Sequence, residues 1–75
     1  MNLNDQNFLR GLGQRIRDLR QARKWTQADL AQRCELHRTF IGSVERGERN
    51  LSILNLRLIA RVLRVAMAEL LAGLA

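Results

Sequence analysis

The stretch T-Q-A-D-L-A-Q-R-C-E-L-H-R-T-F-I-G-S-V-E-R, from Thr26 to Arg46, decides the fold of this chain. It predicts two short helices, from residue 27 to 33 and from residue 37 or 38 to 46, joined by a tight turn. Its apolar residues fall where a two-helix unit needs interior contacts: Leu30, Ala31, Cys34, Leu36, Ile41 and Val44. Thr26 and Asp29 are suited to begin the first helix, and Gly47 to end the second in a left-handed conformation. The polar side chains between the apolar ones are expected to face outward.

A longer helix precedes this unit. Phe8, Leu12, Ile16 and Leu19 recur at helical spacing, which predicts a helix from about residue 7 to residue 23. The polar residues at positions 2, 4, 5 and 7 are each able to cap its start. Two glycines, at positions 11 and 13, weaken it by about 1 kcal/mol each relative to alanine.

Two further helices follow the unit. Ser52 is suited to cap a helix over residues 53 to 63, whose wheel has a core face, a basic stripe and a second apolar strip. A short helix around residues 67 to 72 adds more leucines. One small domain rarely needs two apolar faces, and exposed strips of this kind mark interfaces. The expected interface residues are Leu54, Leu58, Val62, Leu70, Leu71 and Leu74. The expected fold is all-α, a compact five-helix domain over residues 1–75.

Composition narrows the function classes. Thirteen basic residues against seven acidic ones give a net charge of +6, and twelve of the thirteen are arginine. This balance favours an anionic partner such as nucleic acid, without choosing between DNA and RNA. The chain has one histidine, one cysteine and no tyrosine, with no carboxylate pair or glycine-rich phosphate loop. We therefore expect no enzyme, cofactor, metal or small-molecule ligand. With no signal peptide or membrane span in the sequence, a cytoplasmic protein without a membrane partner is expected.

The residues Gln27, Ala31, Leu36, Ile41 and Glu45 have the spacing that makes this stretch resemble the helix-turn-helix of the phage Cro and repressor family, often called Xre-like. The segment H-R-T-F-I-G-S-V-E-R-G-E-R-N-L-S, residues 37–52, is similar to the controller proteins of restriction–modification systems. One departure stands in the turn, where the family usually has glycine and this chain has Glu35. A left-handed conformation there would cost about 1 kcal/mol.

The resemblance implies a homodimer that binds palindromic double-stranded DNA operators, activating and also repressing its own gene, with RNA polymerase as a partner when it activates. The helix after the turn would enter the major groove. The candidates for reading bases, with Arg38 as the first choice, are Arg38, Thr39, Phe40, Ser43 and Arg46. The phosphate-binding candidates are Gln27, Arg23, Lys24, His37, Asn50 and Ser52. Similar controllers often carry tyrosine where this chain has Phe40.

Several alternatives stay open at this stage. The chain could be a stand-alone phage-type repressor, or an antitoxin or adaptor whose apolar C-terminal surface binds a different protein. Arg23 and Lys24 suit a helix dipole as well as phosphates, Ser52 suits a helix cap, and His37 suits a cap or a plain surface position. Trp25 is expected to be a core anchor, and Glu45 to pair with Arg38 or Arg49.

Overall fold

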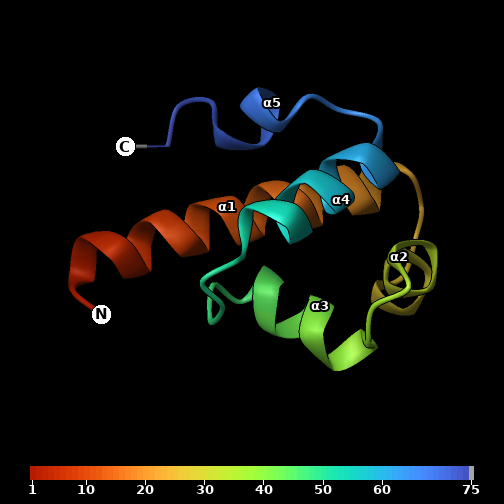
Figure 1. The fold of residues 1–75 in the computed structure, drawn as a ribbon, viewed down its shortest axis with the longest axis horizontal. Coiled ribbons are helices and arrows are strands. Elements are labelled where there is room, and N and C mark those ends of the chain that lie inside the picture. Colours follow the sequence, from red (N-terminus) through yellow and green to blue (C-terminus); the bar gives the residue numbers. More distant parts are fainter. Residues whose placement is uncertain (75) are drawn as a thin grey trace.

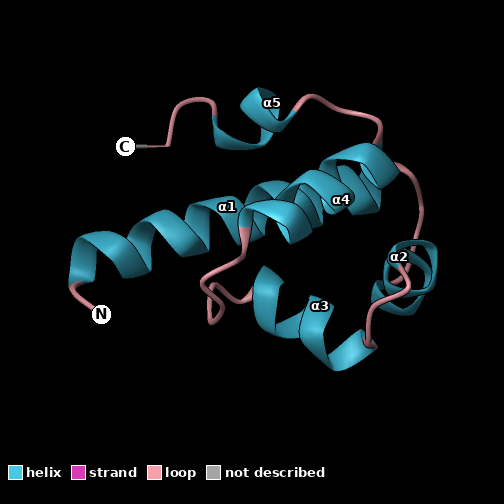
Figure 2. Ribbon diagram, in the orientation of Figure 1, coloured by secondary structure: helices cyan, strands magenta, loops and turns pink. Residues whose placement is uncertain are grey.

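The computed structural model describes residues 1–74, which form five helices joined by short loops (Figures 1 and 2). The helices are α1 (Leu3–Ala22), α2 (Gln27–Cys34), α3 (Arg38–Glu45), α4 (Ile53–Leu63) and α5 (Met67–Leu71). Helix α3 packs against α1 and α2, α4 packs against α2, and α5 packs against α1 and α4. The described residues contain no strand, so the predicted five-helix all-α fold is confirmed. None of these helices combines the length and the apolar character that crossing a membrane requires.

The helix boundaries follow local capping chemistry. Thr26 and Asp29 form a reciprocal capping box at the start of α2, with Asp29 N donating to Thr26 Oγ1 at 3.0 Å and Thr26 N to Asp29 Oδ2 at 2.8 Å. The hydrogen bond from Thr26 N to the carboxylate lowers the pKa of Asp29. Ser52 caps α4 as predicted, accepting a hydrogen bond from Asn55 N at 3.1 Å. Helix α1 begins earlier than the apolar spacing predicted, because Asn2 caps it by accepting from Asp5 N at 2.8 Å.

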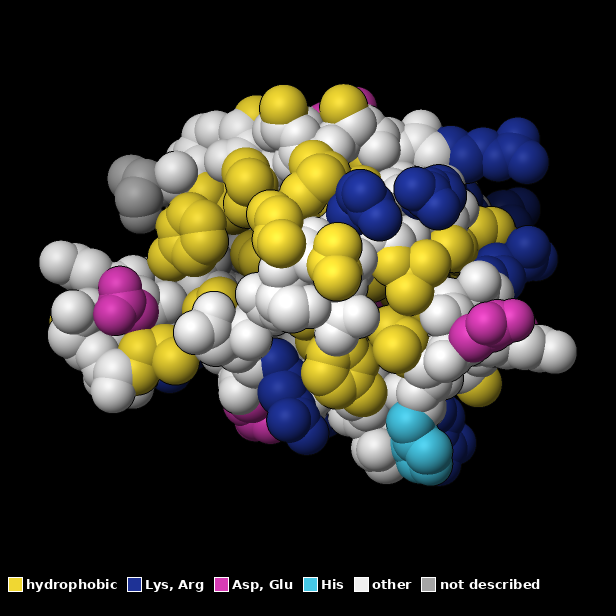
Figure 3. Space-filling model, in the orientation of Figure 1, with side chains coloured by type: hydrophobic (Ala, Val, Ile, Leu, Met, Phe, Trp, Pro, Cys, Tyr) yellow, Lys and Arg dark blue, Asp and Glu magenta, His cyan; other side chains and the backbone are white. Residues whose placement is uncertain are grey.

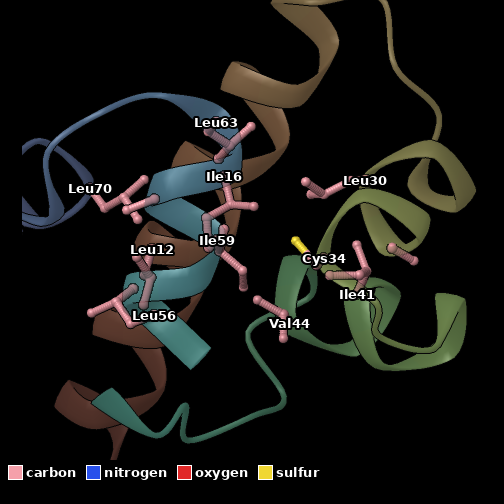
Figure 4. Close-up of a cluster of buried hydrophobic side chains, with 12 residues drawn as sticks. Leu12, Ile16, Leu30, Cys34, Ile41, Val44, Leu56, Ile59, Leu63 and Leu70 are labelled. Atoms are coloured by element: carbon pink, nitrogen blue, oxygen red, sulfur yellow. The ribbon is translucent and has the colours of Figure 1, made fainter. Parts of the chain in front are cut away.

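Side chains from all five helices meet in one core (Figure 4). Ile16, Leu30, Ile41, Ile59 and Leu63 are fully buried there, as their spacing predicted. Cys34 also lies in this cluster, and burial raises the pKa of its thiol to about 11. Trp25 packs against the core but is only half-buried.

The prediction for Leu70 is wrong. This residue was expected on an exposed interface strip, but it is fully buried in the core, where α5 covers α1 and α4. The guanidinium of Arg15 holds α5 in this position, donating hydrogen bonds to the carbonyl oxygens of Glu69 and Ala72. No other residue of α5 is buried as deeply, so Leu70 anchors this short helix to the core.

The turn between α2 and α3 has the conformation that the sequence predicted. Glu35 has φ 56° and ψ 38°, in the left-handed region, and its backbone N–H contacts the carbonyls that end α2. Lys24 and Arg64 also have positive φ, at 60° and 61°, after α1 and α4. A side chain at such a φ costs about 1–2 kcal/mol relative to the right-handed region. Each of these three helix ends therefore carries a charged residue where glycine would be less strained.

Gly13 lies where α1 and α3 come closest. A Cβ at this position would stand 2.4 Å from the carbonyl oxygen of Val44 and 2.6 Å from that of Glu45. Real Cβ atoms do not approach backbone oxygens so closely. The glycine that appeared only to weaken α1 therefore allows α3 to pack against it.

Gly13→Ala should lower the free energy of unfolding by about 1–3 kcal/mol, because an added methyl group would push α3 away from α1. Gly11→Ala is the matched control on the same helix, where an added Cβ meets only the flexible end of Leu74, at 2.9 Å. The control should be neutral or gain up to about 1 kcal/mol in helix propensity. Urea unfolding followed by circular dichroism measures both. Equal stability of the two variants would contradict the close-approach argument.

Candidate nucleic-acid interface

The start of α3 presents two of the predicted base-reading side chains to solvent. Arg38 and Thr39 occupy the first two positions of the helix, and both are exposed. Because α3 is held to the molecule by Ile41, Val44 and Glu45, its N-terminal turn projects from the surface. An α-helix end of this kind fits the width of the DNA major groove.

His37 caps α3 and fixes the hydroxyl of Thr39. The imidazole Nδ1 accepts a hydrogen bond from Thr39 N at 3.1 Å and lies 2.7 Å from Thr39 Oγ1. In the tautomer whose Nδ1 accepts from the amide, this nitrogen carries no hydrogen, and the hydroxyl then donates its own hydrogen to it. Thr39 then offers only lone pairs and its methyl group to a ligand. Of the three roles left open for His37, the structure assigns the cap.

A buried ion pair joins α1 to α3. Arg20 donates from Nε to Glu45 Oε2 at 2.6 Å and from Nη2 to Glu45 Oε1 at 2.9 Å, and both residues are 7% exposed. The hydrogen bonds with Glu45 raise the pKa of Arg20. Glu45 was expected to form a structural ion pair with an arginine, and it does, but the partners suggested, Arg38 and Arg49, are wrong. A signal for the true partner was present, because Arg20 and Glu45 each continue an apolar face four residues after Ile16 and Ile41.

The same ion pair positions the start of α2. Gln27 Nε2 donates to Glu45 Oε1 at 3.0 Å, and Arg20 Nη1 donates to the carbonyl oxygen of Trp25 at 2.8 Å. The Gln27 side chain thus lies across α3, beside Gly42, where an added Cβ would come within 3.3 Å of its Oε1. Arg46 Nη1 lies on the same spot, 3.2 Å from that Cβ position. Gly42 leaves room for both polar side chains at the helix surface.

Ser43, Phe40 and Arg49 form a second polar arrangement, at the end of α3. Ser43 is buried, its hydroxyl donating to the carbonyl oxygen of Phe40 at 2.7 Å and accepting from Arg49 Nε at 3.0 Å. The guanidinium of Arg49 lies 5.3 Å from the centre of the Phe40 ring. Ser43 therefore does not face outward as predicted, and its hydroxyl holds Arg49 instead. Sequence reasoning did not single out Arg49 for DNA, because only its charge marks it in a polar loop.

The remaining candidates differ in position. Lys24, Asn50 and Ser52 are exposed. Arg46 is exposed and forms an ion pair with Glu48, Nε to Oε2 at 3.1 Å, which lowers the pKa of Glu48. Arg23 differs from the prediction, since its guanidinium donates to the carbonyl oxygens of Leu19 and Leu63 and thus ties α1 to α4. Its place at those helix ends does not favour a phosphate contact beside α3.

Three segments thus form one polar surface: the start of α2, the start of α3, and the loop over residues 46–52. In the orientation of Figure 1, basic side chains appear along the lower edge of the molecule, beside α3 (Figure 3). Backbone N–H groups at helix starts and clustered arginines are the features with which proteins contact DNA phosphates. The arrangement fits a duplex that lies across α2 and α3.

Comparison with known proteins gives the same assignment. A family model described as helix-turn-helix matches residues 16–70. Control protein C.BamHI from Bacillus amyloliquefaciens is 42% identical over 60 residues, covering 79% of this chain and 74% of its own length. Control protein C.SmaI from Serratia marcescens is 40% identical over 60 residues, covering 80% and 71%.

A solved structure of another controller protein is also similar to this chain. The crystal structure of the restriction-modification controller protein C.AhdI from Aeromonas hydrophila matches with a TM-score of 0.80 at 42% identity, covering 83% of this chain and 94% of that one. The predicted resemblance to the Xre-like helix-turn-helix, and to controller proteins within it, is confirmed. The chain belongs to the helix-turn-helix family, and it is a DNA-binding transcription regulator rather than an enzyme.

Proposed function

We propose that this protein is the controller of a restriction–modification system and acts as a homodimer on palindromic operators. The observation that carries the proposal is its identity of 42% and 40% to two control proteins, over alignments of 60 residues. In this proposal, bound dimers activate transcription or repress the protein's own gene according to where the operators lie relative to the promoter. RNA polymerase is the partner during activation.

Base reading is assigned to the exposed start of α3. The guanidinium of Arg38 has the fork geometry for a bidentate pair with guanine O6 and N7. Thr39 accepts a hydrogen bond, because its own hydrogen is directed to His37. Its partner is then the amino group of adenine N6 or cytosine N4, and its methyl group packs against a neighbouring thymine methyl. Phe40 follows these two residues in α3, and Arg46 lies at the other end of the helix, as its C-cap.

Phosphate contacts are assigned to residues around that edge. Gln27 is held by Glu45 at the start of α2, where it donates to a backbone phosphate together with nearby N–H groups. Lys24, Asn50 and Ser52 are exposed on the flanks, and Arg49 adds a charge that Ser43 and Phe40 hold in position. These contacts determine the affinity and the register of binding, and the start of α3 determines which DNA sequence is bound.

Dimerisation is assigned to the apolar surface that α4 and α5 leave uncovered. Leu54 is 63% exposed, and Leu58, Leu71 and Leu74 are half-buried. Hydrophobic side chains gather over α4 and α5 in Figure 3. A twofold axis through this surface would set two copies of α3 about 34 Å apart, one turn of DNA. The whole chain, residues 1–75, then serves as one domain for both DNA binding and dimerisation.

Arg38→Ala should remove about 1–3 kcal/mol of discrimination at one base pair of each half-site. The measurement is fluorescence anisotropy with operators selected from a random library and their single-base variants. Lys24→Ala is the comparison, since it should weaken all sequences equally and reduce the salt slope by about one. An unchanged base preference in Arg38→Ala would refute the assignment of Arg38.

Thr39→Val keeps the size of the side chain and removes the acceptor, so it should cost about 1 kcal/mol at the base pair that Thr39 reads. Removing the amino group from the contacted adenine or cytosine should cost the wild-type protein a similar amount and cost the Thr39→Val variant nothing further. Binding titrations in this double-mutant cycle give the coupling energy. Fully additive losses would show that Thr39 does not accept from that amino group.

Leu54→Glu should convert the dimer to a monomer and weaken operator binding, because a charge would be buried at the twofold axis. Ile53→Glu is the matched control, since Ile53 is 66% exposed on the adjacent position of α4 and outside the strip. Sedimentation equilibrium measures the mass of each variant, and circular dichroism checks its folding. A monomeric wild-type protein, or a dimer in both variants, would overturn the proposed interface.

A further inference from the structure

Four arginines surround a hollow that lies between the ends of α1 and α4 and one side of α2. The hollow has a volume of about 600 Å³ and is lined by Arg23, Trp25, Arg33, Arg61, Val62 and Arg64. It lies where the C-terminal ends of α1 and α4 meet α2, and α3 contributes no residue to it. None of the lining residues is acidic. Nearly a third of the basic side chains of the protein therefore face one small space.

Two of these arginines are already held in place. The guanidinium of Arg23 donates to the carbonyl oxygen of Leu19 at 2.7 Å and to that of Leu63. The guanidinium of Arg33 lies 4.2 Å from the centre of the Trp25 ring. A cation over an aromatic face loses less freedom when it binds an anion. The guanidinium groups of Arg23 and Arg33 are thus already held in position beside the hollow.

The other two arginines, Arg61 and Arg64, lie exposed at the end of α4. Arg64 occupies the left-handed position that ends this helix, with φ 61°, where glycine would be less strained. The chain therefore carries a charge at the rim of the hollow in a conformation that disfavours any side chain.

The geometry points to an acidic peptide segment of a partner protein as the occupant of this hollow. Guanidinium groups bind carboxylates in bidentate pairs, and several in one space match a run of Asp or Glu side chains. A nucleotide is a poorer match, because Arg33 covers one side of the Trp25 ring while the ring packs against the core. A base that stacked on the ring face under Arg33 would have to displace that guanidinium.

DNA is also a poorer match, because of where the hollow lies. In Figure 1 the C-terminal end of α4 lies above α2, and α3 lies along the lower edge of the molecule. A duplex centred on the start of α3 would leave Arg61 and Arg64, at the end of α4, facing solvent. The hollow would then be open to a protein that meets the regulator on its operator, which goes beyond the DNA binding and dimerisation proposed above.

Trp25 is the only tryptophan, so its emission reports directly on the hollow. The full-length protein is titrated with an octaglutamate peptide, and with octaglutamine as the uncharged control. Octaglutamate should give a saturable change in Trp25 emission. The double variant Arg61→Ala/Arg64→Ala should weaken this binding about five- to tenfold, because surface ion pairs contribute up to about 1 kcal/mol each. Operator affinity of the same variant should stay within about twofold.

Arg17→Ala/Arg57→Ala is the matched control, since it removes two exposed arginines that do not line the hollow. Its octaglutamate affinity should fall less than twofold. An equal loss in both double variants would show that only net charge matters and overturn the proposal. Displacement of the peptide by lower concentrations of pyrophosphate would assign the hollow to a small phosphate anion instead. An equally large loss of duplex DNA binding in Arg61→Ala/Arg64→Ala would assign it to the DNA surface.

Discussion

The buried ion pair between Arg20 and Glu45 is the interaction on which the rest of the structure depends. Burying two charges costs several kcal/mol, and only short, fully satisfied hydrogen bonds offset that cost. Here the guanidinium donates two hydrogen bonds to Glu45 and one to the carbonyl oxygen of Trp25. Gln27 donates a further hydrogen bond to the carboxylate of Glu45. One carboxylate thereby fixes the positions of α1, α2 and α3 relative to one another. Removing either charge would leave the other buried without a partner, at a cost of about 3–5 kcal/mol.

The scaffold and the reading surface use different side chains of the same helix. Ile41, Val44 and Glu45 hold α3 to its neighbours, and Gly13 lets it approach α1. Arg38 and Thr39 take no part in that packing and stay exposed. The polar residues of α3 that were predicted to face outward are thus of two kinds. Arg38 and Thr39 are exposed, whereas Ser43 is buried and hydrogen-bonded to Phe40 and Arg49.

Most of the fold could be predicted from the sequence, because capping residues and apolar spacing act locally. The start of α2 and the whole of α4 follow from Thr26, Ser52 and helix periodicity, and the left-handed conformation of Glu35 fits the glycine that the resembling family usually has there. What depends on tertiary contact could not be predicted in that way. The partner of Glu45, the burial of Leu70 and the need for Gly13 arise where segments distant in sequence meet. Leu70 was grouped with the exposed leucines because the spacing within one short helix does not show which of its residues meets α1 and α4.

The separation of roles along α3 has a consequence for how relatives diverge. In the proposed assignment, a substitution at position 38 or 39 would alter the groups offered to DNA without disturbing the ion pair, the core or the close approach at Gly13. New operator sequences are therefore accessible to this scaffold by single substitutions that leave its folding unharmed. Duplicated copies of such a gene can acquire separate targets quickly, and two regulators in one cell can avoid responding to each other's sites.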